Sequence, residues 1–205
     1  MSAEGLTQIL RHPAIWRGSN AAQTKAIATG FAELDESLPG NGWPRSGLVE
    51  ILVPRLGSGE LCLLMPLLAA LTNQETARWC AWIAPPYQPF APALAARGIA
   101  LERMLVVRTT EPLWALEQAL GLGACEVVLA WVRYLSPRDI RRLQLAAERG
   151  RTLGILFRGH RAARESSSAV LRVLLEPAGQ GVRLTLLKSR GGRPGPIQLR
   201  VWDAH

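Results

Sequence analysis

Short apolar runs alternate with longer segments of helical period from Gly47 onward. The runs are rich in β-branched and aromatic residues and predict strands at 48–53, 79–84, 104–108, 127–132 and 153–157. The segments between them predict helices at 60–73, 89–97, 112–121 and 137–149. Strands that alternate with helices are typical of a parallel sheet with crossover connections. The pattern therefore predicts an α/β fold with a doubly wound, mostly parallel sheet flanked by helices.

The last of these helices carries its own start signal. Ser136 stands where an N-cap is expected, and Pro137 follows at the first helical position, where a missing N–H costs little. Ile140, Leu143 and Ala147 recur on one side of the helix. We therefore expect this side to pack on the sheet.

The pattern changes after residue 157. A polar and basic stretch, GHRAARESSS, leads to apolar runs at 170–175 and 182–188, which flank the turn-rich PAGQG. Two runs separated in this way indicate a β-hairpin, and a further short strand is predicted at 197–202. We expect these strands to form a basic, antiparallel C-terminal β extension at about 166–205.

Composition narrows the class of protein. The chain has 205 residues, of which 48% are hydrophobic, and this suits one domain with a substantial core. Its apolar runs are shorter than the roughly 20 residues that a membrane span needs, and its first residues lack the features of a signal peptide. We therefore expect a cytoplasmic protein.

The cysteines Cys62, Cys80 and Cys125 lie far apart in apolar segments, which predicts small buried side chains and no metal site.

The net charge of +8 is distributed unevenly. Residues 1–132 contain 9 Lys and Arg against 11 Asp and Glu, whereas residues 133–205 contain 15 against 5. A basic C-terminal third favours an anionic partner, with nucleic acid as the first candidate. The alternative is that these residues, nearly all of them Arg, form hydrated faces.

The stretch TGFAELDESLPGNGWPRSGLVEI at residues 29–51 resembles the entry to the RecA core. The resemblance implies a RecA-like domain at 29–205, preceded by an N-terminal lead at 1–28. In RecA the corresponding lead packs on a neighbouring protomer. Ile15 and Trp16 are therefore candidate docking residues, either on this chain's own core or on a partner, which leaves a homo-oligomer open.

The phosphate-binding loop that should follow this entry is degenerate. A Walker A loop reads G-x-x-x-x-G-K-[ST], and its lysine and hydroxyl bind the phosphates and magnesium. Here the loop reads VPRLGSGEL, with Val53 at the first glycine, Glu60 at the lysine and Leu61 at the hydroxyl residue. Gly57 and Gly59 remain and are expected to form a tight strand-to-helix turn. Glu60 would repel phosphates, so we predict no nucleotide binding, and its charge suits the helix N-terminus.

The strand that should carry the second nucleotide-binding motif supports the same interpretation. A Walker B strand ends in Asp, whereas VVLAWVR has Ala130 and Trp131 at this place. The acidic residues Glu33, Asp35 and Glu36 are interpreted as an exposed loop. The sequence therefore predicts a protein that is no enzyme, has no catalytic residues and needs no cofactor.

Among RecA-like proteins without Walker motifs, the chain resembles the ImuA family of translesion-synthesis accessory proteins. The segments HPAIWRG, WIAPPYQPFAPALAARGI, ALGLGACEVVLAW and LLKSRGGRPGPIQL carry this resemblance over nearly the whole chain. It implies a role in SOS-dependent mutagenic DNA repair. The implied partners are an ImuB-like polymerase relative, RecA and single-stranded DNA, with association to the nucleoid if DNA is bound.

The central block at about 47–158 also resembles the SulA family. SulA-like proteins are SOS-induced inhibitors of cell division that bind FtsZ and block its polymerisation. Because they are shorter and typically lack the long lead and the basic C-terminal strands, the sequence favours the ImuA family and keeps SulA-type division inhibition as the alternative.

The RecA resemblance implies that the loops after the fourth and fifth core strands line a DNA path. These loops and the C-terminal strands are rich in basic residues that could follow a phosphate backbone without reading its sequence. The candidate DNA-binding or partner-binding residues are Arg133, Arg158, His160, Arg161, Arg164, Lys188, Arg190 and Arg193.

Overall fold

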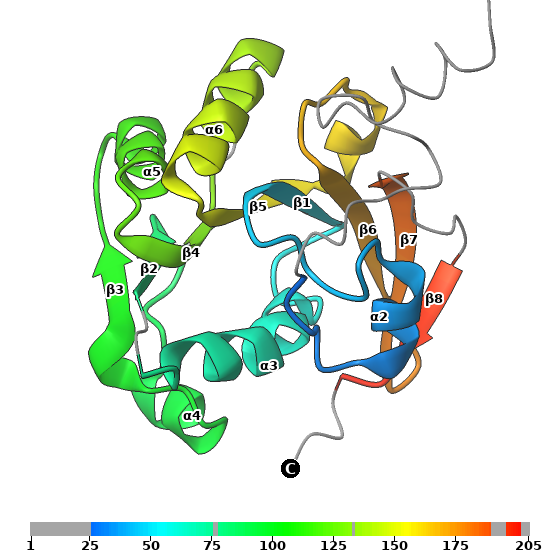
Figure 1. Cartoon of the computed structure of the whole chain (residues 1–205). Helices are drawn as coiled ribbons and strands as arrows, with labels where there is room; N and C mark the ends of the chain where they lie inside the picture. Colours follow the sequence, from blue (N-terminus) through cyan, green and yellow to red (C-terminus); the bar gives the residue numbers. More distant parts are fainter. Residues whose placement is uncertain (1–25, 76–77, 133, 190–195, 202–205) are drawn as a thin grey trace, which may run out of the picture.

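The computed structural model describes residues 26–75, 78–132, 134–189 and 196–201. These residues form one eight-stranded sheet in the order β3-β2-β4-β5-β1-β6-β7-β8 (Figure 1). The strands are β1 Gly47–Val53, β2 Trp79–Ile83, β3 Met104–Val107, β4 Cys125–Ala130, β5 Leu153–Gly159, β6 Leu171–Ala178, β7 Gly181–Ser189 and β8 Pro196–Leu199. All pairings from β3 to β6 are parallel, and β7 and β8 pair antiparallel.

This arrangement confirms the predicted mostly parallel sheet with antiparallel C-terminal strands. The C-terminal strands extend the same sheet, because β6 pairs with β1 in parallel before the chain turns back into β7. The RecA-like assignment and the domain limits at 28 and 29 stay predictions.

Helices cover both faces of the sheet. They are α2 Ala32–Ser37, α3 Glu60–Thr72, α4 Ala91–Ala96, α5 Pro112–Gly121 and α6 Pro137–Gly150, with short 3₁₀ turns η1 Leu101–Arg103 and η2 His160–Arg164. The core on one face includes α3 and α4, and the core on the other face includes α5 and α6 (Figure 1). Between them β1 is buried at every residue, as expected of a strand covered on both faces.

The predicted strands and the four predicted helices are confirmed with small shifts at their ends. Helix α4 begins at Ala91, later than residue 89, where the expected helix started. The acidic stretch interpreted as a loop is helix α2, because Leu34 on this segment is fully buried in the core and fixes its backbone. A single apolar residue among acids leaves too weak a periodic signal to reveal so short a helix.

The start of α6 agrees with its sequence signals. The Ser136 hydroxyl accepts a hydrogen bond from the Asp139 N–H at 3.2 Å, and the Asp139 carboxylate accepts one from the Ser136 N–H at 3.0 Å. This reciprocal capping box satisfies two N–H groups that a helix start leaves free. Ile140, Leu143 and Ala147 are fully buried, as predicted.

The segment before β1 is tied to the core by Trp43. The Ile27 N–H donates to the Trp43 carbonyl at 2.8 Å, and the Trp43 N–H donates to the Ile27 carbonyl at 2.7 Å. A Cβ at Gly42 would lie 2.2 Å from the Ile27 carbonyl oxygen, so this close approach needs glycine. The Trp43 side chain is fully buried. The entry to the sheet is therefore anchored by its own tryptophan.

A buried charge cluster joins the three adjacent strands β5, β1 and β6. Glu50 on β1 accepts hydrogen bonds from Arg158 on β5, at 2.7 Å, and from Arg172 on β6. Arg158 also pairs with Glu165 at 2.8 Å, and Arg172 donates to the carbonyl oxygens of Glu165 and Ala162. The side chains of Glu50, Arg158 and Arg172 are 0%, 4% and 7% exposed. The cluster therefore connects the strands to the turn η2.

The thiols of Cys62, Cys80 and Cys125 are free, and Cys80 and Cys125 are buried as predicted, whereas Cys62 is only partly buried. Burial, with Cys125 and Glu126 nearby, raises the pKa of Cys80 to about 12. This thiol is therefore neutral at physiological pH and packs as a small apolar side chain, as predicted. Among the described residues, no helix has the length and apolarity that crossing a membrane requires.

Candidate functional site

A hollow of about 430 Å³ lies beside α3 and α4, at the carboxyl ends of β1, β2 and β4. In parallel sheets this end is where ligands usually bind. We call this site the aromatic hollow. It is lined by Leu56, Gly57, residues 59–62, Met65, Trp82, residues 85–90, Ala93, Leu94, Arg97 and Trp131.

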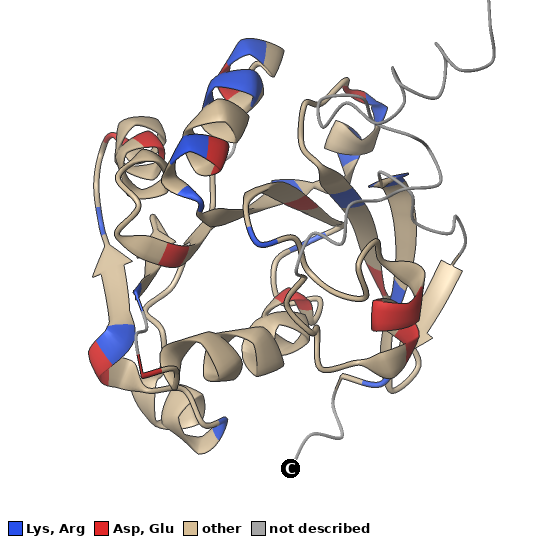
Figure 2. Ribbon diagram, viewed as in Figure 1, with Lys and Arg blue, Asp and Glu red and all other residues tan. Residues whose placement is uncertain are grey.

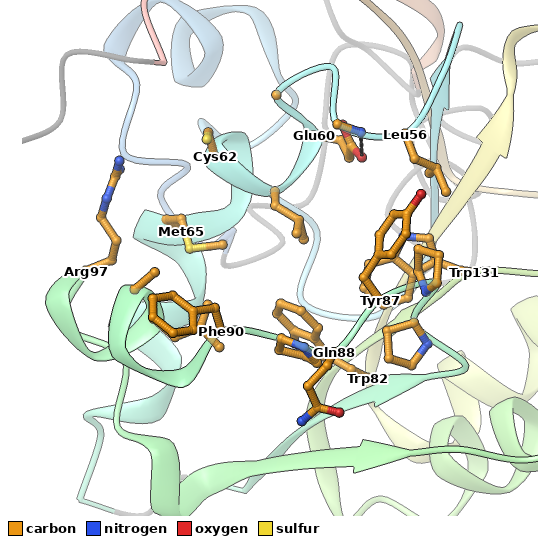
Figure 3. A pocket seen from close by; sticks show the side chains of 18 residues that line it. Leu56, Glu60, Cys62, Met65, Trp82, Tyr87, Gln88, Phe90, Arg97 and Trp131 are labelled. Atoms are coloured by element: carbon orange, nitrogen blue, oxygen red, sulfur yellow. Dashed lines mark hydrogen bonds between the residues drawn. The ribbon is translucent and has the colours of Figure 1, made fainter.

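Aromatic side chains form the wall and the rim of the aromatic hollow (Figure 3). Trp82 on β2 and Trp131 after β4 meet with their ring centroids 5.5 Å apart, and Trp131 stacks on the buried Phe157. This packing holds the two indoles in place. Tyr87 and Phe90 follow β2 and are 78% and 71% exposed. Large exposed apolar rings beside a hollow are typical of a protein-binding surface.

The segment predicted to be a degenerate phosphate loop forms one end of this site. Val53 ends β1 and is buried, whereas Leu61 is half-buried and lines the hollow. Gly57 and Gly59 adopt φ values of 83° and 100°, a left-handed conformation that favours glycine and forms the predicted tight turn. The Glu60 carboxylate accepts a hydrogen bond from the Gly57 N–H at 2.7 Å. In a phosphate-binding loop, backbone N–H groups donate hydrogen bonds to the nucleotide. Here the Gly57 N–H donates to a carboxylate of the loop itself.

Few charges reach the aromatic hollow. Glu60 is the only charged residue of α3, and Figure 2 shows the rest of that helix uncharged. Arg97 follows α4 and lies at the other end of the site from Glu60 (Figure 3). Burial raises the pKa of the Cys62 thiol between them, so this side chain is neutral at physiological pH. The site is therefore apolar, with one buried carboxylate and one arginine at its edge.

A second hollow, of about 630 Å³, lies beside η2 and is called the basic hollow. It is lined by Pro54, His160, Arg161, Ala163, Arg164, Leu174 and Glu176. The structure thus brings together three of the candidate DNA-binding residues, His160, Arg161 and Arg164, and all three are exposed. Their side chains provide a compact group of donors for an anion.

The other basic candidates do not join this group in the described structure. Arg158 was expected on a DNA path, but it is buried and paired with Glu50 and Glu165, so its guanidinium is not at the surface. Lys188 lies on β7, where its ammonium donates to the Ser167 carbonyl at 2.7 Å. The candidates Arg133, Arg190, Arg193, Ile15 and Trp16 lie outside the described residues.

The loop at one end of this site is visible in the sequence, whereas the aromatic hollow was not predicted. Trp131 was noted only at the place of a Walker B aspartate and was not placed with Trp82 beside Tyr87 and Phe90. A signal was present in PPYQPF, residues 85–90, because two aromatic residues among prolines directly follow a strand. Prolines restrict this loop and keep its rings available at the surface.

The fold and the site define an α/β protein with an aromatic hollow at the carboxyl ends of its parallel strands. The family model described as "Cell division inhibitor SulA" matches residues 54–154. The SulA protein of Photorhabdus laumondii is 36% identical over 116 residues, which cover 54% of this chain and 63% of that protein. The SulA protein of Edwardsiella piscicida is 33% identical over 117 residues, which cover 56% of this chain and 69% of that protein. This chain belongs to the SulA family.

A solved relative is the crystal structure of SulA from Pseudomonas aeruginosa. It is 30% identical, with a TM-score of 0.46, and the match covers 54% of this chain and 96% of that one. The chain thus spans less than two thirds of the Photorhabdus protein and little more than half of its own length is matched. The segments quoted from the sequence favoured the ImuA family over the SulA family. The comparisons support SulA and do not support ImuA specifically.

Proposed function

We propose that this protein is a non-enzymatic inhibitor of cell division of the SulA type, which binds FtsZ through the aromatic hollow and blocks its polymerisation. The observation that supports this proposal is the position of the lining residues along the chain. Every residue that lines the aromatic hollow lies between Leu56 and Trp131, inside the segment 54–154 that the SulA model matches. The feature best suited to protein binding therefore belongs to the part of the chain that is similar to known division inhibitors.

The chemistry of the loop supports binding without catalysis. Glu60 occupies the place of the phosphate-binding lysine and is bonded to the Gly57 N–H. A nucleotide phosphate at this place would meet a carboxylate and lose an amide donor. We propose that the protein acts in the cytoplasm during the SOS response, by occupying a surface of FtsZ that filament assembly needs.

A double substitution, Tyr87→Ala with Phe90→Ala, should abolish most of this activity. The two rings are largely exposed, so their loss should change the free energy of unfolding by less than about 0.5 kcal/mol. Aromatic anchors at the centre of an interface are typical hot spots, so FtsZ affinity should fall roughly 30-fold or more. The measurement is FtsZ polymerisation, by light scattering and sedimentation, with the purified full chain added at increasing ratios.

Tyr134→Ala is the matched control. Tyr134 is 89% exposed and does not line the aromatic hollow, so this variant should inhibit like the unchanged protein. Unimpeded FtsZ assembly at a severalfold excess of the unchanged chain would refute the proposal. Full inhibition by the double variant would refute the assignment of the surface.

The basic hollow favours a second candidate function, that of an accessory protein in mutagenic translesion synthesis. Its residues His160, Arg161 and Arg164 follow residue 154, beyond the SulA-matched segment, as do the strands β6, β7 and β8. Of the segments that resemble the ImuA family, LLKSRGGRPGPIQL at residues 186–199 also follows the SulA-matched segment. In this role the basic hollow contacts single-stranded DNA or a partner such as RecA or an ImuB-like polymerase relative, and the protein acts at the nucleoid.

A substitution pair tests this second function. Arg161→Ala with Arg164→Ala should weaken binding to an oligothymidine, measured by fluorescence anisotropy, and should lower the slope of log K against log salt by about 1.4, roughly 0.7 for each phosphate contact. Arg138→Ala with Arg141→Ala, which removes two exposed arginines of α6, should leave the slope near its original value. Absence of DNA binding at low salt, or equal slopes for both pairs, would contradict a DNA role for the basic hollow.

A further inference from the structure

Within the part of the chain that the structure describes, the aromatic hollow contains a buried carboxylate oxygen without a hydrogen-bond partner. Glu60 is 3% exposed, and its Oε1 atom is occupied by the Gly57 N–H at 2.7 Å. Its Oε2 atom is buried and unpaired. The indole N–H of Trp82, on the wall of the same hollow, is also buried and unpaired. Such groups cost free energy when they are left unsatisfied, and they mark a place where a partner's polar atoms fit.

The surroundings of Glu60 select the kind of partner group. Trp82, Trp131 and Tyr87 present π-systems to the hollow, and the faces of such rings attract cations. A carboxylate at one end and aromatic rings along the wall together favour a positively charged group with apolar surface. Arg97 lines the hollow from the other end in Figure 3, away from Glu60.

We propose that the aromatic hollow receives an arginine side chain from a protein partner, with Glu60 Oε2 as its acceptor. A guanidinium is planar, stacks on aromatic rings and keeps its charge when it is desolvated, whereas an ammonium is strongly hydrated. The flanking residues of the partner are apolar, because the remaining lining, from Leu56 to Leu94, is largely apolar. The Trp82 N–H is available for a carbonyl oxygen of the same segment.

This inference rests on the proposed function, since it specifies what the division protein, or another partner, presents to the site. A nucleic acid does not fit, because its phosphates would approach the Glu60 carboxylate. The volume of about 430 Å³ accommodates one long side chain with part of its neighbours, which suits a peptide segment inserted from a partner surface.

The test uses the full chain and two short peptides, acetyl-Leu-Arg-Leu-amide and the same peptide with citrulline, the neutral analogue of arginine. Binding is followed by NMR through the indole N–H resonances of Trp82 and Trp131. We expect the arginine peptide to shift both resonances at millimolar concentration and to bind about tenfold more tightly than the citrulline peptide, because a hydrogen bond to a charged group is the stronger one.

Glu60→Gln should remove this preference. Glutamine keeps an oxygen for the Gly57 N–H, so the loop should hold its shape while the charge at Oε2 is lost. The arginine peptide should then bind no better than the citrulline peptide. Glu102→Gln, at an exposed acid outside the hollow, is the control and should keep the tenfold difference. If Glu60→Gln fails to fold, Tyr87→Ala, which changes an exposed ring, should still weaken the arginine peptide.

The outcomes separate this inference from the proposed function. Equal binding of both peptides, no shift at all, or a preference that survives Glu60→Gln overturns the arginine site, even if FtsZ assembly is inhibited. A preference that depends on Glu60 supports the arginine site, even if FtsZ is unaffected and the partner is another protein.

Discussion

Replacing Glu50 by alanine is expected to lower the free energy of unfolding by about 3–5 kcal/mol. Glu50 is the shared acceptor of Arg158 and Arg172, and all three side chains are buried. Without it, two guanidinium groups would stay buried with fewer partners, and breaking a buried ion pair from one side costs more than losing the pair as a whole. Urea unfolding followed by tryptophan fluorescence gives the difference.

Glu117→Ala is the matched control for that variant. Glu117 pairs with Arg142 at 3.0 Å, but the Arg142 side chain is 51% exposed, so water replaces the lost partner. Its loss should cost at most about 1 kcal/mol. If Glu50→Ala lowered the free energy of unfolding by no more than this control does, the buried charge cluster would not stabilise the packing of β5, β1 and β6 in the way its geometry indicates.

Replacing Trp43 by alanine is expected to destabilise the protein by about 3–5 kcal/mol as well. The Trp43 side chain is fully buried and belongs to the core that includes α3, so its removal leaves a large cavity. The backbone of Trp43 also forms two hydrogen bonds with Ile27. We therefore expect residues 26–46 to lose order together with the loss of stability. Hydrogen exchange of this segment, measured with the unfolding curve, reports both effects.

Trp114→Ala is the comparison for Trp43. Trp114 lies on α5 and is 61% exposed, so the same change of residue type should shift stability by about 0.5 kcal/mol or less. Similar losses for the two variants would mean that Trp43 does not anchor the entry to the sheet.

Much of the fold could be predicted because its signals are local. Apolar runs identified the strands, and the Ser136 capping box with its apolar helix face identified α6, since spacing along the chain encodes both. Helix α2 was not predicted, because Leu34 is its one buried residue and gives no periodic apolar pattern. The strand order was not predicted, because pairing joins segments far apart in the sequence, such as β1 with β5 and β6.

The candidate site shows the same division between local and tertiary information. Glu60 in place of lysine is visible in the sequence, and so is the turn at Gly57 and Gly59. The sequence could not show that Glu60 uses only one of its oxygens, or that Trp82 and Trp131 stand beside Tyr87. These contacts form where the carboxyl ends of the parallel strands β1, β2 and β4 lie on the same side of the fold.

By itself, then, the sequence determined that this protein has a mostly parallel α/β sheet, a glycine turn followed by Glu60 and a basic C-terminal third. Only the tertiary structure decided which charges and rings are exposed and which are buried. It buried Arg158 against Glu50, left Arg161 and Arg164 exposed, and gathered aromatic residues from separate segments around Glu60. The physical reason is that exposure and pairing depend on the residues that surround a side chain in space, and most of those neighbours are distant along the chain.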